Sequence, residues 1–62
     1  MSLAEVMAKM PTDLKELPAF VERLKAAFEE EKVNMPDQLL ARFEALIEEW
    51  ELLVRWVREL LG

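Results

Sequence analysis

Residues 39–61 read LLARFEALIEEWELLVRWVRELL and contain the strongest periodic pattern in the 62-residue chain. Apolar side chains recur there at alternating spacings of four and three: Leu39, Phe43, Leu46, Trp50, Leu53, Val57 and Leu60. A second apolar row runs beside the first at intervals of seven: Leu40, Ile47, Val54 and Leu61. The two rows form the wide apolar stripe of a helix that faces a bundle core, which is broader than the seam of a two-stranded coiled coil.

This pattern predicts a long helix over about residues 36–61, because no proline or glycine interrupts the sequence between Pro36 and Gly62. Asn34 is the expected N-cap, and Pro36 would lie in the first turn, where its missing N–H is tolerated. A helix of about 26 residues extends over roughly 39 Å, which is long for so small a chain.

A medium helix is predicted over about residues 18–32, with Thr12 as a candidate N-cap upstream of it. Pro18 would remove a backbone hydrogen bond from a helix that began at Asp13, so residues 13–17 are expected to form a turn or a kinked first turn. The acidic run at residues 29–31 is interpreted as a solvated helix end. The apolar face of the medium helix consists of Leu17, Phe20, Val21, Leu24, Ala27 and Phe28.

A short helix is predicted over about residues 3–10. Ser2 and Glu5 have the spacing of a capping box at its start, and Pro11 should end it. Two turns of helix are not stable alone, so this segment must dock on the rest of the chain. Its apolar face consists of Leu3, Val6, Met7 and Met10.

The short connection at residues 33–37 predicts an antiparallel helical hairpin. We therefore predict an all-α fold in which residues 1–62 form one domain, a small three-helix bundle of a short, a medium and a long helix. Counting outward from the connection places Phe28 near Phe43, and Lys25 is expected to approach Glu44 or Glu48. The expected core is Phe20, Val21, Leu24, Phe28, Leu40, Phe43, Leu46, Ile47 and Trp50.

The medium helix is too short to shield the second half of the long one. Leu52 and Trp56 also lie off the main stripe, so the last three turns are apolar nearly all round. Either the short helix and the 11–17 turn cover this end, or another molecule does, and we favour a second copy of the chain, most simply a dimer. The expected interface is Leu52, Trp56, Leu53, Val57 and Leu60.

The composition excludes several kinds of chemistry. The chain has a net charge of −5 and contains no cysteine or histidine, so zinc sites built on those ligands, thiolate nucleophiles and histidine bases are ruled out. There is no basic stripe for nucleic acid, and no apolar run approaches the roughly 20 residues of a membrane span. Glu44, Glu48 and Glu51 lie opposite the apolar stripe and are interpreted as a solvated face. We expect no catalytic, cofactor-binding or metal-binding residue.

The sequence thus favours a non-enzymatic helical protein-interaction or self-association module, soluble and cytoplasmic. The alternative is a lipid-surface or apolar-ligand binder that uses the Trp-rich end of the long helix; the acidic polar faces count against it. The strong helix formers, the near-absence of glycine and the capped helix starts favour a designed or engineered bundle. Pro18, the acidic run and the four methionines argue against an idealised design.

Overall fold

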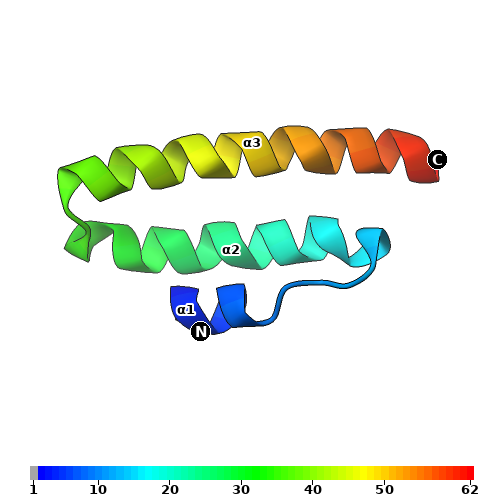
Figure 1. Cartoon of the computed structure of the whole chain (residues 1–62). Coiled ribbons are helices and arrows are strands. Elements are labelled where there is room, and N and C mark those ends of the chain that lie inside the picture. The colour runs from blue at the N-terminus through cyan, green and yellow to red at the C-terminus, as the bar shows by residue number, and fades with distance from the viewer. Residues whose placement is uncertain (1) are drawn as a thin grey trace.

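The computed structural model describes residues 2–62, and its helices follow the predicted order. These are α1 (Leu3–Ala8), α2 (Leu17–Glu31) and α3 (Asp37–Leu61), with 3₁₀ turns η1 (Leu14–Glu16) before α2 and η2 (Lys32–Asn34) after it. Figure 1 shows α2 and α3 antiparallel, with α1 lying along α2. The all-α class and the small helical bundle predicted from the sequence are confirmed.

The start of α2 explains how proline is accommodated there. A 3₁₀ turn occupies residues 14–16, and Pro18 is the second residue of α2. Its missing N–H falls among the first four amides of the helix, which have no intrahelical partner in any case. The turn is capped by Asp13, whose carboxylate accepts a hydrogen bond from the Lys15 N–H at 3.0 Å, so the cap is Asp13 and not Thr12.

Two further helix ends test the predicted caps. The Ser2 hydroxyl accepts a hydrogen bond from the Glu5 N–H at 3.2 Å, as the sequence predicts, although α1 ends earlier than expected, at Ala8. The predicted Asn34 cap of α3 is wrong. Asn34 lies in the 3₁₀ turn that continues α2, and Pro36 stands at the N-cap with extended backbone. Because Asn34 belongs to the 3₁₀ turn that follows α2, its side chain does not cap the start of α3.

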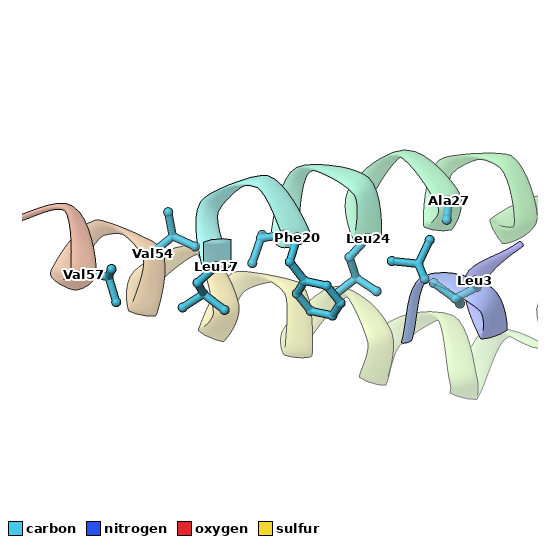
Figure 2. Packing of buried hydrophobic residues seen from close by; sticks show 9 residues of the cluster. Leu3, Leu17, Phe20, Leu24, Ala27, Val54 and Val57 are labelled. Carbon is cyan, nitrogen blue, oxygen red and sulfur yellow. The ribbon is translucent and has the colours of Figure 1, made fainter. Parts of the chain in front are cut away.

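All three helices contribute to one apolar cluster. Its buried members are Leu3, Val6, Leu17, Phe20, Val21, Leu24, Ala27, Val54 and Val57. Figure 2 shows Val54 and Val57 with Leu17 at one end of the cluster, and Leu3 near Leu24 and Ala27 at the other. The cluster therefore follows the length of α2 and joins the second half of α3 to α1.

Two aromatic pairs fix the register of the hairpin. The rings of Phe28 and Phe43 stack with centroids 5.0 Å apart and planes 8° from parallel, which confirms the predicted proximity. Phe20 and Trp50 pack edge to face at 5.8 Å and 65°. Such pairs add about 0.5–1.5 kcal/mol to the stabilisation from burial alone.

The predicted ion pair between α2 and α3 has a different acidic partner. Lys25 Nζ lies 3.5 Å from a carboxylate oxygen of Glu51, and not beside Glu44 or Glu48. Glu51 follows the buried Ile47 by one helical turn, so it lies nearer the α2-facing edge of α3 than Glu48 does. Both side chains are substantially exposed, and such a pair contributes at most about 1 kcal/mol.

The acidic run at the end of α2 has a structural role that the sequence did not indicate. The Glu31 carboxylate accepts a hydrogen bond at 2.8 Å from the Leu3 N–H, the first amide of α1. A carboxylate at a helix N-terminus satisfies an unpaired donor and interacts favourably with the helix dipole. Glu31 is therefore not simply solvated, because it holds the start of α1 against the end of α2.

Glu29 in the same run pairs with Lys32 at 2.8 Å. The side-chain hydrogen bond from Lys32 to Glu29, together with the carboxylate's charge, raises the pKa of the Lys32 ammonium above its usual 10.5. Because the folded-state pKa is raised, this stabilisation is fully present below pH 10.5 and is lost as the pH rises through the raised value. The pair is exposed and adds little to the stability of the fold.

Leu24→Ala is expected to lower the free energy of unfolding by about 2–5 kcal/mol, because it leaves a cavity in the cluster. Leu52→Ala is the matched control: it is the same substitution within a helix, but at a side chain that is 59% exposed. It should change stability by less than about 0.5 kcal/mol at low protein concentration. Urea denaturation measures both. Equal stability of the two variants would contradict this placement of the core.

Glu31→Ala should loosen α1 without melting the hairpin, because it removes the hydrogen bond to the Leu3 amide. The expected cost is about 1–2 kcal/mol, with faster hydrogen exchange at the Val6 and Lys9 amides, which are bonded within the first helix and at its cap. Glu30→Ala removes the same charge from the neighbouring exposed position and serves as control. Unchanged exchange in Glu31→Ala would show that the carboxylate does not hold α1.

Candidate interaction surface

A row of exposed leucines runs along α3 from one end of the helix to the other. Its members are spaced seven residues apart: Leu39, Leu46, Leu53 and Leu60. All four belong to the apolar stripe that the sequence predicts to face the core. They are exposed because α2 packs against the opposite edge of the stripe, where Ile47 and Val54 are buried. We call these four residues the leucine row.

Two further apolar side chains extend this exposed surface towards the polar side of α3. Trp56 is 53% exposed, and Leu52, one helical turn before it, is similarly open. Together with Leu53 and Leu60, these residues form the part of the predicted interface that lies on the surface of the chain. The α1 helix packs on α2 and leaves all four uncovered, so the alternative in which the first helix shields this end is wrong.

The sequence pattern predicts that Val57 belongs to the interface, and the structure corrects this. The residue is 0% exposed and belongs to the apolar cluster, beside Val54 and Leu17 (Figure 2). The η1 turn and the first residue of α2 reach far enough along α3 to bury it. Val57 is therefore not available to a partner.

Leu46 requires the opposite correction. It is 37% exposed and belongs to the leucine row, not to the core. Of the remaining residues expected in the core, Leu40, Phe43 and Trp50 are partly buried. The buried ones are Phe20, Val21, Leu24, Phe28 and Ile47.

A shallow hollow lies at the middle of the leucine row. It is lined by Leu46, Glu49, Trp50 and Leu53. These residues stand at positions i, i+3, i+4 and i+7 of one helix, the arrangement that receives a side chain from a facing helix in knobs-into-holes packing. The hollow is open and shallow, so it suits a helix better than an enclosed small molecule.

A line of mixed character borders the row on its polar side. Arg42, Glu49 and Trp56 follow one another at intervals of seven, each three residues after a member of the leucine row. The strongly acidic face formed by Glu44, Glu48 and Glu51 lies further round the helix. A partner on the leucine row would therefore meet one cation, one anion and one indole at its margin.

The polar side chains in the part of the chain that the structure describes form no cluster typical of a metal site. Within residues 2–62, no three acidic side chains converge as metal ligands would. The Ser2 hydroxyl is engaged as the cap of α1. None of the helices described is long and apolar enough to cross a membrane. Comparison of the chain with protein-family models, curated proteins and solved structures finds no match.

The two tryptophans should report separately on the core and on the exposed surface. Trp50→Phe leaves Trp56 as the only indole, and at low protein concentration its emission should lie at longer wavelength and be quenched more strongly by acrylamide. Trp56→Phe leaves Trp50, which packs on Phe20 and should be the better protected indole. Equal quenching of the two variants would contradict the exposure of Trp56.

Proposed function

We propose that this chain is a non-enzymatic helical interaction module that binds another helix along α3, with self-association as its favoured use. The observation that supports the proposal is the leucine row, an unpartnered apolar line that follows the whole 25-residue helix. Monomeric proteins rarely expose continuous apolar surface of this extent unless it binds something.

The form of the surface favours a helical partner. Members of the row recur every seven residues, so a straight helix lying along α3 meets one of them at every second turn. The hollow at the middle of the row adds a receptor position for a side chain of such a helix. Trp56 lies at the margin, and tryptophan is among the residues that contribute most to binding energy at protein interfaces.

A lipid surface or an apolar ligand is the second candidate function. Arg55 and Arg58 lie on another face of the same helix end as Trp56, and an amphipathic helix with cations on one face and tryptophan on another is typical of membrane-surface binding. The acidic residues over the rest of α3 oppose binding to anionic lipid. A cytoplasmic location and a designed or engineered origin stay predictions from the sequence, and neither alters the proposed surface.

Sedimentation equilibrium over a range of micromolar concentrations tests the proposal. The wild type should self-associate, and Trp56→Glu should weaken association at least tenfold, because it places a charge at the margin of the apolar surface. Ala41→Glu adds the same charge on the exposed polar side of α3. It should associate as strongly as the wild type. Circular dichroism confirms that both variants remain helical. A wild type that stays monomeric at high micromolar concentration would remove self-association as the function.

Flotation with liposomes separates the second candidate from the first. Under our proposal, the chain stays unbound with both zwitterionic and anionic vesicles. Co-flotation with anionic vesicles that Trp56→Glu abolishes would favour the lipid-binding function instead.

A further inference from the structure

We infer that the occupant of the leucine row is α3 of a second copy of this chain, and that the two helices run antiparallel. The inference rests on the proposed function and specifies its partner and geometry. The row extends over 22 residues, from Leu39 to Leu60, or about 31 Å along the helix axis. A partner that covers it all must be a helix of about this length with its own apolar line repeating every seven residues, and α3 meets both requirements.

In an antiparallel pair, each leucine of the row lies level with a leucine of the partner's row. With a two-fold axis between Glu49 and Trp50, Leu39 lies level with the partner's Leu60, and Leu46 lies level with the partner's Leu53. The axis then passes through the hollow at the middle of the row, and the partner's Leu53 and the partner's Leu46 lie level with the two ends of that hollow. Because a line that repeats every seven residues drifts around a straight helix, the two helices should cross at about 20°.

The surface is large enough for a specific but weak pair. From their exposed fractions, the four leucines and Trp56 together present roughly 500 Å² of apolar surface per chain. Two copies would thus bury about 1,000 Å² before any polar rim is counted, which reaches the lower range of specific interfaces. A pair using Leu52 and Trp56 alone would fall short of this range.

The margin of the row favours the antiparallel orientation. A two-fold axis perpendicular to the helices brings Arg42 to the height of the partner's Trp56 on the same side of the seam, where a guanidinium can lie over an indole face. A parallel pair would set Arg42 level with the partner's Arg42 and leave both indoles without a cation. The antiparallel pair also opposes the dipoles of two long helices.

Pulsed dipolar spectroscopy on Gln38→Cys, spin-labelled at this sole cysteine, measures the orientation directly. An antiparallel pair separates the two labels by about 35 Å along the axis, whereas a parallel pair brings them within about 20 Å. A distance near 35 Å supports the inference. A short distance would overturn the orientation but leave the interaction module standing, and the absence of any dipolar signal at high concentration would overturn both.

Arg42→Gln provides a second test, because its effect on the dissociation constant of the dimer depends on the orientation of the two helices. In the antiparallel pair the variant should weaken dimerisation by about 2- to 10-fold, because it removes the cation from the partner's Trp56. Arg55→Gln, which makes the same change on the opposite face of α3, is the control and should leave the dissociation constant unchanged. Sedimentation equilibrium measures both variants. Equal or tighter dimerisation of Arg42→Gln would contradict the antiparallel arrangement.

Discussion

The mismatch between α3 and the helices that cover it governs the rest of this structure. The apolar stripe of α3 follows a 25-residue helix, about 37 Å long, whereas α2 has 15 residues and extends over about 22 Å. One helix can also bury only part of the width of a stripe made of two apolar rows. In the structure, α2 packs against the edge of the stripe that contains Ile47 and Val54, and the leucine row stays exposed. The core and the candidate surface are thus two edges of one pattern.

Because the protein is small, each contact that holds α1 on the hairpin contributes a large part of the stability of α1. The α1 helix is only six residues long and inserts two buried side chains, Leu3 and Val6, which cannot stabilise a helix of this length alone. The Glu31 carboxylate adds a charge-assisted hydrogen bond to the first amide of α1, and it comes from the residue that ends α2. The last turn of α2 therefore has two tasks, since it leads into the hairpin connection and also fixes α1. This explains why an acidic residue is tolerated at a helix end where the dipole disfavours it.

Much of the fold could be predicted from the sequence because its signals are local. Prolines at 11, 18 and 36 lie at or near the helix ends, and the spacing of apolar residues shows which face of each helix is apolar. The sequence predicts Leu46 in the core and Val57 at the interface, whereas the structure exposes Leu46 and buries Val57. Periodicity places both residues on the apolar stripe, but the packing of neighbouring helices determines which edge of that stripe is covered. The bond from Glu31 to Leu3 joins residues 28 positions apart, so no local pattern could reveal it.

Association along the leucine row would also act on the fold itself. Trp50 connects the two regions, because its ring packs edge to face on Phe20 in the core while its side chain lines the hollow in the row. A helix seated in that hollow would restrict the indole and so support the contact between α2 and α3. Binding that requires the folded hairpin stabilises it by mass action, and the gain grows with protein concentration. For a chain this small, a partner on the leucine row would then also add to the stability that its own core supplies.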